Sequence, residues 1–358
     1  MPIMSDTSFL RRRWKYILNL VTVFALLWLV YAIRHQLAQT FRDFAHVNAW
    51  AVLLIIPIEA LNYHAQAKLY QHLFGIVGNK LPYKYLYKMS LELNFVNHVF
   101  PSGGVTGISY FGLRLRKGEE ITGGKATLIQ IMKLGLQFLS FELLIVIGLL
   151  CLAAMGRVNN LTILVASILS TLLLVGTIGF AYIVGSKERI NGFFTAVTQL
   201  LNRLIQLVWR SHPETINITS AKKLFNDFHD NYQMLSSSRA KLKAPFWYAF
   251  MANATEVLAL YVFYIAFGHY VNLGAVIMAY AVANFAGLVS VLPGGVGVYE
   301  ALMTAVMATA GVPARISFPV TVMYRVVNTL VQIPPGYYLY HRNLTHGTSR
   351  VPEPRDAA

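Results

Sequence analysis

The chain has 358 residues, of which 56% are hydrophobic and only 13% are charged, and its mean hydropathy is +0.51. Soluble domains carry about 25% charged residues, so this composition excludes an ordinary soluble enzyme and predicts a membrane protein. The net charge of +15 predicts cytoplasmic loops rich in Lys and Arg that face anionic lipid. A nucleic-acid partner is not expected, because no binding motif for one is present.

Apolar runs recur along the chain at close to the ~20 residues that a helix needs to cross ~30 Å of hydrocarbon. The basic cluster at 11–15 places the N-terminus in the cytoplasm. The predicted fold class is therefore all-α, a polytopic membrane bundle of six spans and two re-entrant hairpins. The expected spans are 16–33, 49–74, 126–155, 161–184, 246–267 and 316–340.

The two predicted hairpins interrupt this series of spans. The first begins with Ser90–Phe100, whose 11 residues rise 1.5 Å each and cover only about half of the hydrocarbon. Pro101-Ser102-Gly103-Gly104 then breaks the helix, and a short apolar piece ends at Arg114. The second hairpin, 273–310, is broken at Pro293-Gly294-Gly295, and 273–292 is also compatible with a full span. Broken helices at membrane depth are tolerated where protein or a wet cavity surrounds them.

The remaining segments complete the predicted topology. Segment 186–245 has nine Lys and Arg against four Asp and Glu, so it is expected to be cytoplasmic. The membrane domain is predicted to cover 1–344, with repeat halves at about 49–155 and 246–341. The tail 345–358, which contains two prolines, is expected to be disordered. Both termini then lie in the cytoplasm.

An internal repeat is the most informative pattern. Asn94-Phe95 followed by Pro101–Gly104 recurs as Asn284-Phe285 followed by Pro293–Gly295, and Lys133 recurs as Arg325 after 192 residues. In the topology above, one hairpin opens from the cytoplasm and the other from outside, which makes the repeat inverted. Inverted repeats with broken helices are typical of transporters that work by alternating access.

The repeat also predicts a binding site. Helix ends and glycine-rich backbone bind anions, and two intramembrane cations behind them favour a lipid phosphate. The expected substrate-binding residues are Pro101, Ser102, Gly103, Gly104, Lys133, Pro293, Gly294, Gly295, Glu300, Tyr324, Arg325 and Asn328. Since Arg binds phosphate with two N–H groups, Arg325 is expected to matter more than Lys133. The alternative is that Arg325 only pairs with Glu300.

Charges inside the membrane cost roughly 2.5–3.5 kcal/mol each. The other residues expected to carry a charge at membrane depth are Glu59, Glu142 and Glu256.

The stretch from Pro293 to Glu300, with Gly311 and Tyr324-Arg325, resembles the lysylphosphatidylglycerol synthase transmembrane-region family, also described as the flippase-like domain of multiple peptide resistance factors. Asn94 to Lys117 is similar to the family's first-half signature. The resemblance covers most of the chain and implies a bundle that binds or moves phospholipids or lipid-linked sugars. Family members that make aminoacylated lipids carry a large soluble transferase domain; none is expected here.

Three functions remain open from the sequence. The first is a flippase-like transporter of a phosphate-bearing lipid or lipid-linked precursor in the cytoplasmic membrane. The second is an accessory subunit that docks a soluble synthase through 186–245. The third is a membrane-embedded lipid-phosphate transferase. No zinc-protease motif, nucleotide-binding loop or acidic metal cluster is evident, so no enzyme activity, cofactor or metal is expected.

Overall fold

The computed structural model describes residues 47–100, 105–116, 121–156, 160–186, 239–289 and 297–346, with a few isolated helical positions outside these ranges. Every regular element in these ranges is a helix. Both glycine-rich breaks, 101–104 and 293–295, lie outside the described residues, as do the expected first span, most of 186–245 and the tail after His346.

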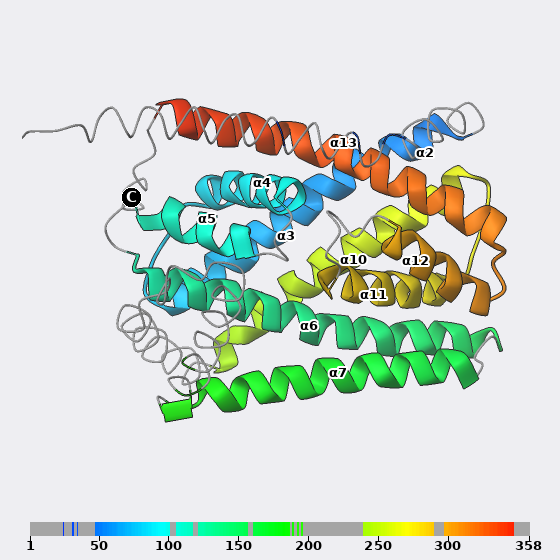
Figure 1. Ribbon diagram of the computed structural model, residues 1–358, viewed down its shortest axis with the longest axis horizontal. Coiled ribbons are helices and arrows are strands. Elements are labelled where there is room, and N and C mark those ends of the chain that lie inside the picture. The colour runs from blue at the N-terminus through cyan, green and yellow to red at the C-terminus, as the bar shows by residue number, and fades with distance from the viewer. Residues whose placement is uncertain are drawn as a thin grey trace, which may run out of the picture.

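The helices follow the chain order of the predicted spans and hairpins (Figure 1). Thr122 caps one of the long helices, because its side-chain oxygen accepts a hydrogen bond from the backbone N–H of Lys125 at 3.3 Å. Gly268 and Gly311 have positive φ and follow other helix ends. The elements are α2 (Ala49–Leu53), α3 (Ile55–Ile76), α4 (Tyr83–Val99), α5 (Val105–Arg116), α6 (Gly123–Ala154), α7 (Asn160–Val184), η2 (Arg239–Leu242), α10 (Lys243–Ala266), α11 (Leu273–Val289), α12 (Val298–Thr309) and α13 (Ala314–His346).

The molecule is a polytopic helical membrane bundle. Four of the described helices are long and apolar enough to cross a membrane: Gly123–Ala154, Thr162–Gly179, Ala240–Ala266 and Ala314–Leu344. The outward face of α7 is apolar and exposed, as expected for a surface against lipid tails. Its large exposed side chains are Ile163, Leu164, Ile168, Leu172, Val175 and Ile178.

The two hairpins occupy opposite ends of the bundle (Figure 1). Lys125 at the start of α6 donates a hydrogen bond to Asn79, just before α4, with 3.2 Å between Nζ and Oδ1. Asn272, just before α11, donates to the carbonyl of Cys151 near the end of α6 at 3.2 Å. The hairpin of α4 and α5 therefore starts beside the beginning of α6, and that of α11 and α12 starts beside its end.

The two groups of four helices match in length and packing. Helices α3, α4, α5 and α6 have 22, 17, 12 and 32 residues, and α10, α11, α12 and α13 have 24, 17, 12 and 33. The first arm of each hairpin packs on the long helix of the other group, α4 on α13 and α11 on α6. Glycines permit both approaches: a Cβ at Gly336 would lie 2.6 Å from the carbonyl oxygen of Leu91, and one at Gly274 would lie 2.2 Å from that of Gly148.

Some predicted boundaries need correction. Helix α4 begins at Tyr83 rather than Ser90. The prediction began at Ser90 because the preceding lysines lower the hydropathy, but lysine has a high helix propensity, so the helix starts directly after Pro82. Helix α13 continues to His346, so the first two residues of the expected tail at 345 are helical. The second expected span is divided at Leu54, and its main part, α3, is long enough to cross but too polar for the group of four apolar helices.

Candidate functional site

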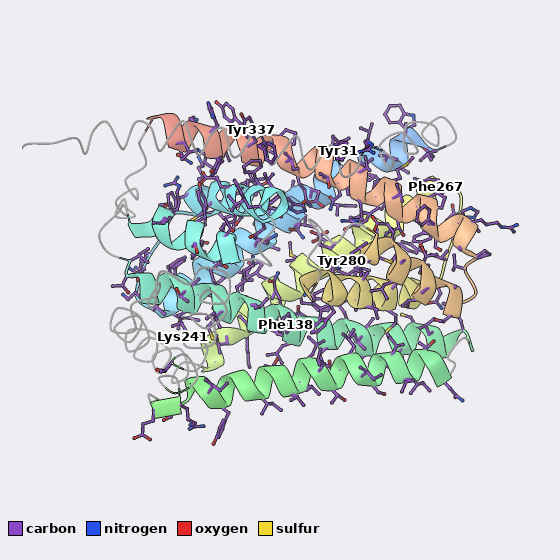
Figure 2. All side chains as sticks on the ribbon, viewed as in Figure 1. Tyr31, Phe138, Lys241, Phe267, Tyr280 and Tyr337 are labelled. Carbon is purple, nitrogen blue, oxygen red and sulfur yellow. The ribbon has the colours of Figure 1, made fainter. Side chains whose placement is uncertain are left out.

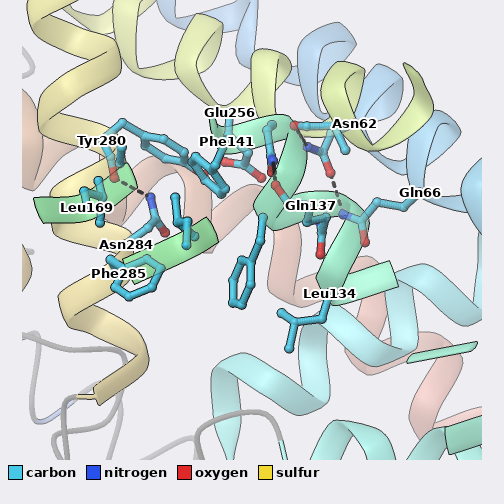
Figure 3. A pocket seen from close by; sticks show the side chains of 15 residues that line it. Asn62, Gln66, Leu134, Gln137, Phe141, Leu169, Glu256, Tyr280, Asn284 and Phe285 are labelled. Carbon is cyan, nitrogen blue, oxygen red and sulfur yellow. Dashed lines mark hydrogen bonds between the residues drawn. The ribbon is translucent and has the colours of Figure 1, made fainter. Parts of the chain in front are cut away.

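A cavity of about 200 Å³ lies where the two groups of four helices meet (Figure 3). Helices α3, α6, α7, α10 and α11 contribute to its wall, and Phe138 and Tyr280 lie near the middle of the bundle (Figure 2). Its polar side chains are Asn62, Gln66, Gln137, Asn253, Glu256 and Asn284, and its apolar ones are Leu134, Phe138, Phe141, Leu169, Leu173, Ala252, Tyr280, Ala281 and Phe285. The lining therefore mixes polar and aromatic side chains, and the amides of α3, α6 and α10 form what we call the polar wall: Asn62, Gln66, Gln137 and Asn253.

Two asparagines fix the polar wall. Asn62 of α3 donates to the carbonyl of Ala252 at 2.8 Å and to the hydroxyl of Thr255 at 2.9 Å, both on α10. Asn253 of α10 donates to the carbonyl of Gln137 at 3.0 Å and to the hydroxyl of Ser140 at 2.5 Å, both on α6. These bonds hold α3, α10 and α6 together at membrane depth, where an unsatisfied polar group costs several kcal/mol.

Lys133 lies beside this wall. Its ammonium donates a hydrogen bond to Oε1 of Gln66 at 3.1 Å and lies 4.9 Å from the centre of the Tyr70 ring. Gln66 in turn donates to Oδ1 of Asn62 at 2.6 Å (Figure 3). Within the described residues, Lys133 makes no ion pair within 4.0 Å. Lys133 is half-buried, and a partly desolvated cation without a counter-ion favours an anionic ligand.

Arg325 has a different environment. Its guanidinium forms an ion pair with Glu300 and lies 4.8 Å from the centre of the Tyr299 ring. The other oxygen of Glu300 accepts a hydrogen bond from the backbone N–H of Gly297 at 2.7 Å, which caps α12. The ion pair that the sequence offered as an alternative is therefore present, and Glu300 also stabilises the start of α12.

Two carboxyl groups lie next to the cavity on α3 and α10. Glu256 lines the cavity, and its Oε2 accepts a hydrogen bond from the hydroxyl of Tyr324 at 2.9 Å. Glu59 is only 2% exposed, and its Oε2 accepts from Nε2 of Gln332 at 2.8 Å. Gln332 also donates to Oδ1 of Asn328 at 3.1 Å. Tyr324 and Asn328, both expected site residues, thus contact the carboxyl groups and their amide partner.

The structure distributes the predicted site residues over several clusters. Arg325 and Glu300 form one pair. Tyr324 and Asn328 lie with Glu256, Glu59 and Gln332, and Lys133 is bound to Gln66 of the polar wall. Neither Lys133 nor Arg325 is among the residues that line the cavity. A common site for the two cations therefore stays a prediction, as does any role of the glycine-rich breaks at 101–104 and 293–295.

Sequence reasoning missed two polar groups. The amides Asn62 and Gln66 follow Glu59 at helical spacing on α3, and this polar stripe was a usable signal. The second group ties the first hairpin to α13. There Glu92, 1% exposed, accepts from Arg114 at 3.1 Å and from the hydroxyl of Tyr110 at 2.7 Å, and it also accepts from Asn343 of α13.

Comparisons with known proteins agree with this architecture. The family model of the lysylphosphatidylglycerol synthase transmembrane region matches residues 16–336. A UPF0104 membrane protein from Methanothermobacter thermautotrophicus is 23% identical over 252 residues, which is 68% of this chain and 71% of that protein. The UPF0104 membrane protein MJ1595 of Methanocaldococcus jannaschii is 21% identical over 296 residues, 82% of this chain and 84% of its own length. This polytopic chain therefore belongs to the lysylphosphatidylglycerol synthase transmembrane-region family.

Proposed function

We propose that this protein is a flippase-like transporter that binds a phosphate-bearing lipid or lipid-linked precursor and moves it across the cytoplasmic membrane. In this proposal the central cavity receives the polar headgroup while the acyl or prenyl chains stay in the lipid. A phosphate cannot cross hydrocarbon unaided, because its charge would lose hydration. The polar wall and the nearby cation replace part of that hydration.

The observation that carries the proposal is the position of Lys133. Its ammonium has three N–H groups and is held beside the cavity through Gln66, with no counter-ion among the described residues. Arg325, in contrast, is already neutralised by Glu300. The order of importance expected from the sequence is therefore reversed in this proposal: Lys133 binds the phosphate, and Arg325 stabilises the bundle.

The arrangement of the helices supports a transport cycle. We take the two groups of four helices as the halves of an inverted repeat, because their lengths match and their hairpins start at opposite ends of α6. Alternating access requires such a pair of halves that move around a central site. The cavity at their junction is the site that this cycle needs.

A reconstituted transport assay tests the proposal. Vesicles that contain the purified protein and a headgroup-labelled anionic lipid should show protein-dependent movement of the label between leaflets. Lys133→Ala should slow it by about 10- to 100-fold, since a hydrogen bond to a charged group contributes about 1.5–3 kcal/mol. Lys125→Ala is the matched control: it lies on the same helix, but it binds Asn79 at the end of the bundle, and it should leave the rate unchanged.

The other functions predict different results. Absence of movement above empty vesicles for a panel of anionic lipids and lipid-linked sugars would count against transport. Stable capture of a soluble synthase through 186–245 would then favour the accessory subunit, and covalent turnover of a lipid phosphate would favour the transferase. Normal transport by Lys133→Ala would leave the function intact but remove Lys133 from the site.

The proposed topology has its own test. Both termini and 186–245 should be cytoplasmic, and the connections before α7 and α11 should face outward. In a Cys151→Ser background, single cysteines at Val158 and Tyr270 should react with a membrane-impermeant reagent added from outside. A single cysteine at Lys222 should react only when the reagent reaches the cytoplasmic side. Labelling of position 222 only from outside would contradict the topology and the inverted repeat together.

A further inference from the structure

Glu59 is buried and Glu256 is half-buried, and the proposed phosphate site uses neither carboxyl group. One comes from α3 and the other from α10, the helices that pack against each other through the middle of the bundle (Figure 1). Both carboxyl groups are bound from α13, Glu59 by Gln332 and Glu256 by Tyr324. Oε1 of Glu59 is buried and has no hydrogen-bond partner in the part of the chain that the structure describes.

The surroundings of this pair offer no compensating positive charge within ion-pair distance among the described residues. Their hydrogen-bond partners, Gln332 and Tyr324, are neutral donors. The titratable groups near the pair on α3, α4, α11, α12 and α13 are phenols, and α6 carries Lys133, bound to Gln66, and Glu142. The phenols are Tyr63, Tyr87, Tyr280, Tyr299 and Tyr324.

Two ionised carboxylates cannot share such a site cheaply. Like charges in a medium of low dielectric constant repel strongly, and a desolvated carboxylate without donors is itself unfavourable. One proton removes most of both penalties, and it then belongs to the pair rather than to either residue. Negative charge is most unfavourable at Oε1 of Glu59, because this oxygen is buried and accepts no hydrogen bond from the described residues.

We propose that Glu59 and Glu256 together hold one exchangeable proton, and that this proton is taken up when an anionic headgroup fills the cavity. This inference rests on the proposed function for its coupling step, but not for the proton site itself. Glu256 lines the cavity and can exchange protons with water that enters it, whereas Glu59 lies behind it. A phosphate next to Glu256 adds negative charge and so favours protonation of the pair. By linkage, protonation of the pair favours binding of the phosphate to the same extent.

The proton site is tested without any lipid transport. Infrared difference spectra of the purified protein, recorded as pH is raised, should show loss of the carbonyl band of a protonated carboxyl group. This band should be missing in Glu59→Gln and altered in Glu256→Gln. Glu142→Gln is the matched control, because Glu142 also has a buried carboxyl oxygen without a hydrogen-bond partner among the described residues. Its spectrum should keep the band.

Wild-type protein without a titrating carboxyl band, or a band lost only in Glu142→Gln, would overturn the proton site. These results do not depend on the folding of the Glu59 variant, since the wild type and the Glu142 variant decide them.

The coupling is tested by calorimetry with a short-chain phosphatidylglycerol in two buffers of different ionisation heat. At a pH above the midpoint of the infrared titration, where the empty pair has lost its proton, wild-type protein should take up close to one proton per lipid bound, and Glu59→Gln should bind with almost none. Equal heats in both buffers for the wild type would overturn the coupling. Absence of binding for this lipid and for a lipid-linked phosphate would overturn the proposed function together with the coupling, whereas the infrared titration would still decide the proton site.

Discussion

The two halves of the molecule use equivalent positions for different chemistry. Lys133 is the eleventh residue of α6 and Arg325 the twelfth of α13, helices of 32 and 33 residues. The first contacts a neutral amide and an aromatic ring, and the second is bound to a carboxylate. The two groups of four helices match in length, but within the described residues only Arg325 of these two half-buried cations has its charge matched by a carboxylate.

This difference shows why a repeat alone does not assign a site. Two basic residues can lie at matching positions of similar helices, and their partners then decide whether each stabilises the fold or is available to a ligand. Glu300 caps α12 and also pairs with Arg325. In the second half, the basic residue is therefore bound to the first turn of α12. In the first half, Lys133 is held by Gln66, which itself lines the cavity.

The largest expected effect is on stability in the second half. Arg325→Ala leaves the buried carboxylate of Glu300 without its counter-ion and should lower the free energy of unfolding by about 3–5 kcal/mol. Lys133→Ala should cost about 1 kcal/mol, because it removes a hydrogen bond to a neutral amide. Thermal unfolding in detergent, followed by tryptophan fluorescence, measures both.

A double variant sharpens this result. Arg325→Met with Glu300→Gln removes both charges and should recover most of the stability that Arg325→Ala loses. An equal loss of stability in Arg325→Ala and Lys133→Ala would break the comparison between the halves.

The sequence predicted the long helices well because hydropathy and charge are local signals. The expected spans 126–155 and 161–184 correspond to Gly123–Ala154 and Asn160–Val184. Contacts between distant helices have no such signal: Asn62 bonds to Thr255 only because α3 and α10 pack together, and the two residues are 193 positions apart along the chain. The pairing of Arg325 with Glu300 was foreseen as an alternative, since the two residues lie on consecutive helices.

The next effect tests whether the cross-packing of the hairpins is equivalent in the two halves. Gly336→Leu drives a side chain into the backbone of α4, and Gly274→Leu drives one into the backbone of α6. Each should cost about 1–3 kcal/mol as an overpacked contact. Gly176→Leu on the exposed face of α7, where a Cβ meets nothing within 4 Å, is the control and should be neutral. If only one of the two variants, Gly336→Leu or Gly274→Leu, lowers the free energy of unfolding, the two halves do not pack in the same way.

The smallest expected effect separates the two asparagines at the centre. Asn62→Ala and Asn253→Ala each remove two hydrogen bonds between helices. Bonds between helices inside a membrane contribute about 0.6 kcal/mol on average and about 1.7 at most, so both variants should unfold only slightly more easily than the wild type.

Their effects on lipid movement should differ, however. Asn62 also accepts the hydrogen bond from Gln66, the residue that holds Lys133, whereas Asn253 contacts the backbone and a hydroxyl group of α6. Loss of Asn62 therefore releases the lysine from the polar wall and should slow transport several-fold, and loss of Asn253 should change it little. Equal slowing by the two variants at equal stability would show that the polar wall, and not the lysine that it positions, limits the rate.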